Sequence, residues 1–279
     1  MCSACKYACP HESIDKTVGS PNEGVCTVCG KRIYVARLVL NEGTIHETVE
    51  YGENVREALE RYKNGGPVVT LLCDVDMGTE ALVVTSEVTG KLLDLNGHTL
   101  SGSGEVVFQI YKKFGFTVRN GAIENTGSGD AIQLILVYSG SYFDGNLTLE
   151  DVNVTAATGW AVKAAYDPND MEGVVNPGNG VYIKSGTYKG GLNGGALRII
   201  QISGGTFIAN PDTHSIMNPG PVIGPSALQK YLAPEHTYAD AEGNAINYFS
   251  SENHTLGGQD EFAGVSHGYL AECGDGDNH

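Results

Sequence analysis

The sequence feature that most constrains the fold is a two-part pattern that recurs five times between residues 91 and 218. Its first part alternates apolar and polar residues before a turn residue, as in FTVRNGAI at 116–123 and VYIKSGTY at 181–188. Its second part is a short apolar step, and 15 or 16 residues separate the apolar residues of the two parts in every copy. Such regularity predicts a solenoid, in which each copy buries its apolar face only by stacking on the next.

Each first part is predicted to be a half-buried strand that runs into a tight turn. Stacking at the roughly 4.8 Å spacing of neighbouring strands would align the apolar residues in three columns around a narrow core. This arrangement describes an all-β, single-stranded parallel β-helix with about five to six coils. The expected columns are Leu93, Phe116, Leu147, Val181 and Ile200; Leu100, Ile123, Val154, Tyr188 and Phe207; and Phe108, Ile132, Val162, Leu197 and Ile216.

Two consecutive joints between copies form long loops, at 135–146 and 165–180. Insertions in a solenoid collect at one corner, so we expect these loops to lie side by side and to form a binding face. Their aromatic and acidic residues suit stacking against a sugar or weak binding of calcium, or else they pack and solvate the loops. The candidate ligand-binding residues are Tyr138, Tyr142, Asp144, Tyr166, Asp167 and Asp170, with Trp160 on the intervening strand.

Outward positions of the stacked strands are expected to align in two ladders. The first alternates in charge, which indicates cross-strand ion pairing. In the second, Lys163 and Arg198 could meet an anionic glycan or could be solubilising residues. Asp130, in the turn GSGDAI, is interpreted as a turn residue leading into the next strand. The two ladders are Asn96, Arg119, Glu150, Lys184 and Ser203, and Gln109, Gln133, Lys163, Arg198 and Met217.

Five of the seven cysteines lie within the first 29 residues, and two pairs have the spacing C-x-x-C. Paired thiolates two residues apart, with a glycine after the second pair, are typical of a knuckle that binds tetrahedral zinc. We favour the ligand set without Cys2 and Cys5, because that first pair resembles the closing half of a preceding knuckle. The alternative to any metal site is a set of disulfides in an exported protein. The favoured ligands are Cys9, His11, Cys26 and Cys29, and in the other set Cys2 and Cys5 replace Cys9 and His11.

The segments around the repeats are expected to cap the solenoid. An amphipathic helix is predicted at 53–64, with Asn54 as its cap, followed by strands at 68–72 and 81–84. A short helix at 226–231 would close the other end. The expected organisation is a Cys-rich segment at 1–36, a β-helix at 37–248 and an acidic, flexible tail at 249–279. Within the β-helix, 37–90 is the N-terminal cap, 91–218 the coils and 219–248 the C-terminal cap.

Composition restricts the class of partner. The net charge is −16, and residues 231–279 contain no Lys or Arg, which argues against nucleic acid. Thirty-eight glycines and only 18% charged residues fit a turn-rich β architecture. The sequence contains no apolar run long enough for a membrane span and no visible signal peptide, although the chain could be a fragment of a longer polypeptide with other modules.

Several motifs resemble one known family. They are Glu57-Ala58-Leu59, the run VTLLCD at 69–74, LDLNGHTL at 93–100 and SGGTF at 203–207. Together they look like the pectin-lyase-like right-handed β-helix proteins that gut Firmicutes encode as cell-surface proteins, some with small zinc knuckles ahead of the helix. The resemblance covers about residues 9–248 and implies a right-handed helix in an extracellular or cell-surface protein. The paired-aspartate, GHG and RIK signatures of the related hydrolases do not occur.

These observations favour a non-catalytic module that binds a glycan or another surface ligand, with structural zinc and a possible calcium site. One alternative is a carbohydrate-active enzyme, either a polysaccharide lyase or a glycoside hydrolase, with its site near Lys163 and Arg198 or in the long loops. Another is a structural spacer in a longer surface protein. Fold resemblance does not decide among the three.

Overall fold

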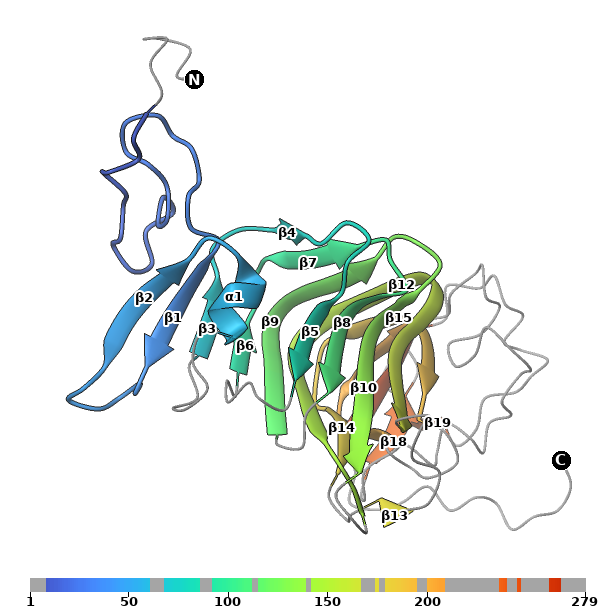
Figure 1. Ribbon diagram of the computed structural model, residues 1–279. Helices are drawn as coiled ribbons and strands as arrows, with labels where there is room; N and C mark the ends of the chain where they lie inside the picture. The colour runs from blue at the N-terminus through green and yellow to red at the C-terminus, as the bar shows by residue number, and fades with distance from the viewer. Residues whose placement is uncertain are drawn as a thin grey trace, which may run out of the picture.

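The computed structural model describes residues 9–60, 68–85, 92–111, 115–138, 142–166, 174–175, 179–194, 200–208, 236–239, 245–246 and 261–266. This part of the chain is mostly β, with one short helix, and its strands form a curled sheet (Figure 1). The elements are β1 (Ala36–Leu40), β2 (Thr48–Gly52), α1 (Val55–Glu60), β3 (Val68–Leu71), β4 (Val75–Asp76), β5 (Leu82–Thr85), β6 (Leu92–Asp94), β7 (Thr99–Gly102), β8 (Val106–Tyr111), β9 (Gly115–Asn125), β10 (Asp130–Tyr138), β11 (Tyr142–Asp144), β12 (Asn146–Tyr166), β13 (Val174–Val175), β14 (Gly180–Ile183), β15 (Thr187–Asn193), β16 (Ile200–Ile202), β17 (Gly205–Ile208), β18 (His236–Ala239), β19 (Ala245–Ile246) and β20 (Glu261–Ser266).

Most strands pair in parallel, in three ladders. The first ladder runs β3, β6, β9, β12, β14 and β16; the second runs β4, β7, β9, β12, β15 and β17; the third runs β5, β8, β10, β12 and β15. The long strands β9, β12 and β15 continue around a corner and therefore take part in more than one ladder. The sheet curls because of these corners, and its concave side carries the core.

Inward positions of the ladders confirm most of the expected columns. Phe116, Leu147, Val181 and Ile200 are successive register partners, and so are Leu100, Ile123, Val154, Tyr188 and Phe207. In the third column Phe108, Ile132 and Val162 align as expected, but the next partner is Leu192. Leu197 and Ile216 lie outside the described residues. Burial of alternate residues is what fixes this register.

The first coil departs from the expected alignment by two residues. Leu93 pairs with Val118 rather than with Phe116, although the following strands align Leu100 with Ile123 as predicted. The cause is a wider corner: five residues separate Asp94 from Thr99, whereas their partners Arg119 and Ala122 are three residues apart. The outward ladder therefore begins at Asp94, not at Asn96.

Corner residues explain why this sequence turns where it does. Asn120 and Asp151 follow the outward ladder residues and have φ of 58° and 53°. Asn and Asp tolerate this left-handed conformation better than other non-glycine residues. At the corresponding corner of the next coil, Gly186 has a φ of 102°, and a Cβ there would lie 2.1 Å from the carbonyl oxygen of Val152. A glycine is required at that corner.

The N-terminal end of the curled sheet is covered by the β1–β2 hairpin and α1. β1 pairs antiparallel with both β2 and β3, so the hairpin extends the first ladder. In α1 the Asn54 side chain accepts a hydrogen bond from the backbone N–H of Arg56 (2.8 Å), which confirms the predicted cap. The helix is described to Glu60, its buried face is Val55, Ala58 and Leu59, and residues 61–64 of the predicted helix lie outside the described residues.

At the C-terminal end, β20 lies within the segment predicted to be a flexible tail. Its six residues pair antiparallel with β17 and with β18. The second ladder reaches its last described strand at β17, whose outer edge offers unpaired backbone groups to such a partner. The helix predicted at 226–231 and the rest of the tail lie outside the described residues. No helix in the described part is long and apolar enough to cross a membrane.

Candidate metal centre

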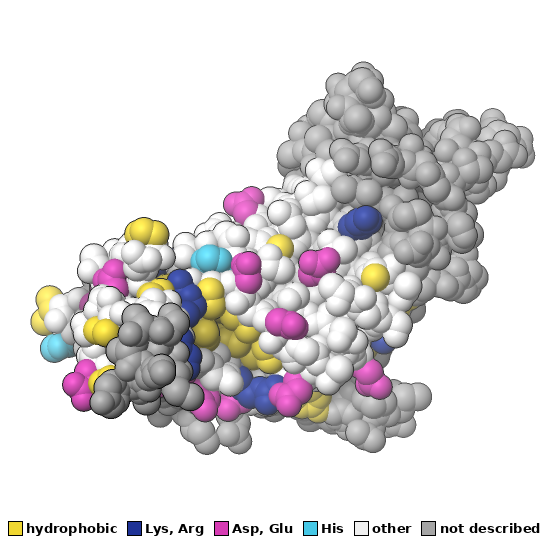
Figure 2. All heavy atoms as spheres, turned by 90° about the horizontal axis from the view of Figure 1, so that it is seen from above, with side chains coloured by type: hydrophobic (Ala, Val, Ile, Leu, Met, Phe, Trp, Pro, Cys, Tyr) yellow, Lys and Arg dark blue, Asp and Glu magenta, His cyan; other side chains and the backbone are white. Residues whose placement is uncertain are grey.

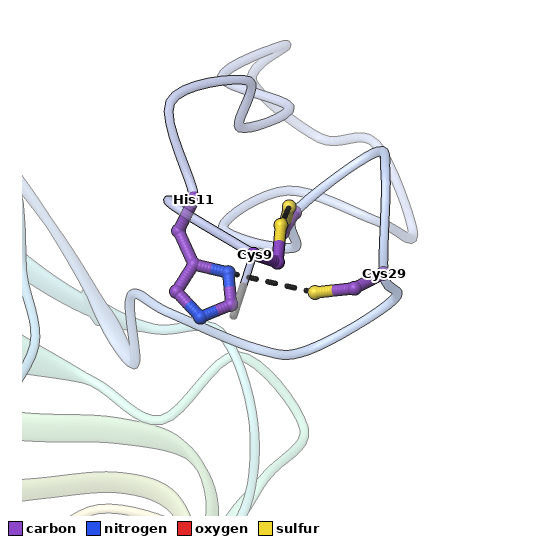
Figure 3. Close-up of side chains that lie close together, drawn as sticks. Cys9, His11 and Cys29 are labelled. Atoms are coloured by element: carbon purple, nitrogen blue, oxygen red, sulfur yellow. Dashed lines mark hydrogen bonds between the residues drawn. The ribbon is translucent and has the colours of Figure 1, made fainter. Parts of the chain in front are cut away.

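Cys9, His11, Cys26 and Cys29 come together in the N-terminal segment, as the favoured ligand set predicts. One potential ligand atom from each residue lies within 4.8 Å of the others. The Cys9 and Cys26 sulfur atoms are 3.5 Å apart, and the Cys29 sulfur lies 3.5 Å from Nδ1 of His11. Figure 3 shows the His11 ring turned toward Cys29, with Cys9 beside them. Cys2 and Cys5 lie outside the described residues.

A tight backbone hairpin presents the second pair of thiols. Gly30 has a φ of 71°, and its N–H donates to the carbonyl of Cys26 (2.9 Å). The N–H of Cys26 in turn donates to the carbonyl of Lys31 (2.8 Å). These bonds turn the chain between the two cysteines so that both sulfurs lie on one side, which is the geometry that C-x-x-C followed by Gly predicts.

The first pair of ligands is attached to this hairpin by backbone pairing. Ile14 forms an antiparallel bridge with Cys26, and the N–H of Thr27 donates to the carbonyl of Ser13 (2.9 Å). His11 has a φ of 56°, an uncommon conformation for a residue with a side chain. The sharp local turn directs its imidazole back toward the cysteines.

The electrostatics of the cluster favour at least one thiolate. The His11 imidazole, followed by the backbone N–H of Cys29, lowers the pKa of the Cys26 thiol to about 6. The pKa of Cys9 is raised, because desolvation and the neighbouring thiols of Cys26 and Cys29 together outweigh the opposing effect of the His11 backbone. Cys26 is also fully buried, whereas the other three members are half-buried.

Three thiols and one imidazole at these distances could hold one metal ion. Sulfur and imidazole nitrogen are the donors that tetrahedral structural sites use. The disulfide alternative finds no support among the described cysteines, since Cys9, Cys26, Cys29 and Cys73 are all free. Cys73 is half-buried, and burial raises the pKa of its thiol.

The described parts of the two long loops lie side by side, as predicted. β10 and β11 form an antiparallel hairpin in which Tyr138 pairs with Phe143. β11 then pairs in parallel with β13, which comes from the second loop, and Tyr142 is the partner of Val174. Tyr142 and Asp144 are thus strand residues of a small sheet at this corner, and Tyr166 ends β12. Asp167, Asp170 and Arg198 lie outside the described residues.

Trp160 and Lys163 adjoin Asp130 on the third ladder. The Asp130 carboxylate accepts a hydrogen bond from the backbone N–H of Trp160 (3.0 Å) and lies 3.5 Å from Nζ of Lys163. Asp130 is the first residue of β10 and pairs in register with Val106, so it lies in the strand into which the predicted turn leads. Lys163 is flanked by Gln133 and by Asn193, so the register places Asn193 where Arg198 was expected.

The first outward ladder consists of ion pairs, as the alternating charges predict. Asp94 contacts Arg119 (2.9 Å) and Glu150 contacts Lys184 (2.7 Å). On the face seen in Figure 2, acidic side chains of the described surface stand singly instead of gathering in one cluster. The Glu150–Lys184 pair is exposed, and exposed pairs contribute little to stability.

Sequence reasoning missed a buried ion pair next to the metal cluster. Glu23, only 3% exposed, contacts Nη1 of Arg37 in β1 at 2.8 Å. Glu23 lies in a loop with no periodic pattern, and Arg37 alternates like any half-buried strand residue. Glu23 is one of three acidic residues in the cysteine-rich segment, and nothing in the sequence distinguishes it from the other two.

Together, the described residues define a mostly β protein of stacked parallel strands with a Cys/His cluster that could hold a metal ion. Comparison of the chain with known protein families, with curated proteins and with solved structures gives no match in any of the three.

Proposed function

We propose that this chain is a non-catalytic β-helix module of an extracellular or cell-surface protein, and that it binds a glycan or another surface ligand. The β-helix is supported by six register partners with fully buried side chains along the first ladder. They are Val69, Leu93, Val118, Leu149, Ile183 and Ile202. The pectin-lyase-like lineage and the right-handed coil are part of this proposal and rest on the sequence motifs.

The observation that carries the binding proposal is the shared sheet of β10, β11 and β13. Two joints that are separate in sequence emerge at one corner and hydrogen-bond to each other. The coils at this corner are longer than their neighbours: 25 residues separate Leu93 from Val118, but 31 separate Val118 from Leu149 and 34 separate Leu149 from Ile183. The extra residues are rich in Tyr and Asp, the types that stack on sugars and accept bonds from hydroxyls.

The non-catalytic part of the proposal is supported by the contacts of Lys163 and Asp130. A lyase would use Lys163 as a free base, whereas here its ammonium group lies beside a carboxylate and a row of amides. Gln109 donates to Gln133 (2.6 Å), and Gln133 donates to Asp130 (3.3 Å). This hydrogen-bonded row is what a structural role for Asp130 requires.

For the metal centre we propose one structural zinc ion, held by the three thiolates and the His11 imidazole. Zinc has no redox chemistry of its own, and it favours a tetrahedral set of sulfur and nitrogen ligands. The four residues fit this ion because their ligand atoms converge from a single hairpin and its N-terminal extension. Bound zinc would hold that segment in one conformation, since a fold this small buries little apolar surface of its own.

A glycan array combined with a polysaccharide degradation screen tests the binding proposal. We expect the wild-type chain to retain one class of glycan and release no product. Tyr142→Ala should weaken retention about fivefold, because loss of one aromatic contact removes about 1 kcal/mol. Glu105→Gln is the matched control at an exposed site away from the corner. New reducing ends or unsaturated uronates would show that the protein is a carbohydrate-active enzyme instead. Failure to retain any ligand would favour the structural spacer.

A further inference from the structure

The Cys-rich hairpin is fixed to the end of the curled sheet by specific contacts, and the buried ion pair of Glu23 and Arg37 is the central one. Arg37 lies in β1, where it pairs in register with Tyr51 of β2 and Thr70 of β3. Glu23 lies three residues before the metal-cluster residue Cys26. The pair therefore connects β1, the middle strand of the cap, with the loop that leads directly into the cluster.

Glu23 also orders the loop in which it lies. Its Oε2 accepts hydrogen bonds from the N–H of Gly19 (2.9 Å) and from Arg37 (2.8 Å). Its backbone carbonyl accepts a hydrogen bond from Nη1 of Arg32 (2.8 Å), and Arg32 forms an antiparallel β-bridge with Val25. Displacement of this one carboxylate would release two anchors of the loop at once, the bonds from Gly19 and from Arg37.

Further contacts pack the loop against the cap strands beside the pair. A Cβ at Gly24 would come within 2.6 Å of the Tyr34 carbonyl and 3.2 Å of the Leu72 side chain, so the loop backbone lies directly against the end of β3. The Tyr51 hydroxyl donates to the carbonyl of Lys16 (2.9 Å), and the Lys16 ammonium lies over the Tyr34 and Tyr51 rings. Burial, followed by the Glu23 carboxylate, raises the pKa of Tyr51 to about 12.

From this geometry we infer that Glu23 and Arg37 are positioning residues for the metal centre, and that metal binding and docking of the cap strands are thermodynamically coupled through them. Neither residue belongs to the ligand set. The inference rests on the proposed metal site. If docking of the Glu23 loop onto the cap strands brings Cys26 and Cys29 close to Cys9 and His11, docking raises the metal affinity by a certain factor. Bound metal must then stabilise docking by the same factor.

Zinc titration against a competing chromophoric chelator tests this coupling in the whole chain. Arg37→Met should weaken zinc binding about tenfold or more, within the usual range of coupling between sites, although it removes no ligand. Arg56→Met is the matched control, because Arg56 forms an ion pair with Glu80 at the same end of the molecule and contacts no part of the knuckle among the described residues. Its zinc affinity should equal that of the wild type.

Two further arms keep the result interpretable if Arg37→Met folds poorly. In Glu23→Gln/Arg37→Met both charges are gone, so no buried charge is left unpaired, and zinc binding should still be weakened. Without any substitution, removal of zinc from the wild type should accelerate hydrogen exchange of β1 and β2 by a similar factor. A wild type that binds no zinc would refute the metal site itself. Normal zinc affinity in both variants, with exchange of β1 and β2 unaffected by chelation, would refute the coupling alone.

Discussion

At the scale of single residues, Cys26 is the most constrained member of the metal cluster. Its side chain is fully buried, and both of its backbone groups are hydrogen-bonded within the hairpin. Its lowered pKa means that the thiolate persists to lower pH than that of an ordinary cysteine. The folded protein therefore holds this ligand ready for a metal at neutral pH, whereas Cys9, with its raised pKa, must still lose its proton on binding.

This difference predicts the pH dependence of metal binding. Above about pH 6, Cys26 is already deprotonated and loses no proton when zinc binds. Zinc affinity then rises with pH only because the other ligands lose protons. Below about pH 6, protons compete for Cys26 as well, and the slope of log affinity against pH should steepen by one proton. Competition titrations from pH 5 to pH 8 measure that slope.

Two cysteine substitutions provide the controls for the pH experiment. Cys73→Ser, which changes a free thiol outside the cluster, should keep the wild-type profile. Cys26→Ser should bind zinc more weakly and lose the additional steepening, since the group that takes up the proton has been removed. A profile without any change of slope near pH 6 in the wild type would contradict the assignment to Cys26.

At the scale of the elements, strands such as β12 place alternate residues on opposite faces with opposite energetic roles. Leu149 is fully buried between Val118 and Ile183, its partners in the neighbouring strands. Its chain neighbour Glu150 faces outward and pairs with Lys184, with about a third of its side chain exposed. Burial should therefore decide stability, while the outward ion pairs maintain solubility and register.

Neighbouring substitutions in β12 test this division of roles. Leu149→Ala should lower the free energy of unfolding by about 2–5 kcal/mol, the usual result of truncating a buried leucine. Glu150→Gln should lower it by less than about 1 kcal/mol, because an exposed ion pair is screened by solvent. Denaturant unfolding of both variants beside the wild type gives the two values. Similar losses for both would mean that the outward ladder stabilises the stack.

At this scale, the sequence predicted which residues face the core, but it did not predict the backbone conformation of the corners. Four members of the first column and all five of the second were predicted correctly, because inward positions must be apolar. The two-residue shift of Leu93 was not predictable from the shared Asn-Gly motif. In the first coil Asn96 and Gly97 both have positive φ, at 52° and 80°, whereas in the second only Asn120 does so, which makes the first corner wider.

The candidate site follows the same distinction. Cysteine spacing predicted the metal cluster because two thiolates and a following glycine form one local turn. The ion pair of Glu23 and Arg37 joins a loop to a strand 14 residues later, and no local pattern specifies such a contact. Likewise the joints at 135–146 and 165–180 could be predicted to be neighbours, but their pairing as β11 and β13 depends on where each chain segment leaves its coil.

At the scale of the whole molecule, stability should vary along the stack. β12 has partners on both sides in the first two ladders, while β2 pairs only with β1 among the described strands. In a solenoid each coil is stabilised mainly by its immediate neighbours, so an end strand opens at less cost than a central one. The hairpin at the N-terminal end additionally has Ile45 almost fully exposed near its tip.

Native-state hydrogen exchange tests this gradient. With zinc present, amides of β9 and of the residues Leu147–Val154 of β12 should exchange only through global unfolding, and those of β2 should exchange at least about tenfold faster through local opening. Comparison of the exchange rates at two denaturant concentrations distinguishes the two routes. Uniform protection from β2 to β12 would indicate a single cooperative unit without the expected gradient.

At the corner formed by β10, β11 and β13, the number of residues in the chain can change without altering the geometry of the stacked strands. Register on both sides of this corner is fixed by buried partners: Ile132 with Val162 before it and Phe116 with Leu147 after it. The residues between can change in number without displacing either set. The segment that projects at this corner could therefore be exchanged for one of different length while the interior of the stack remains the same.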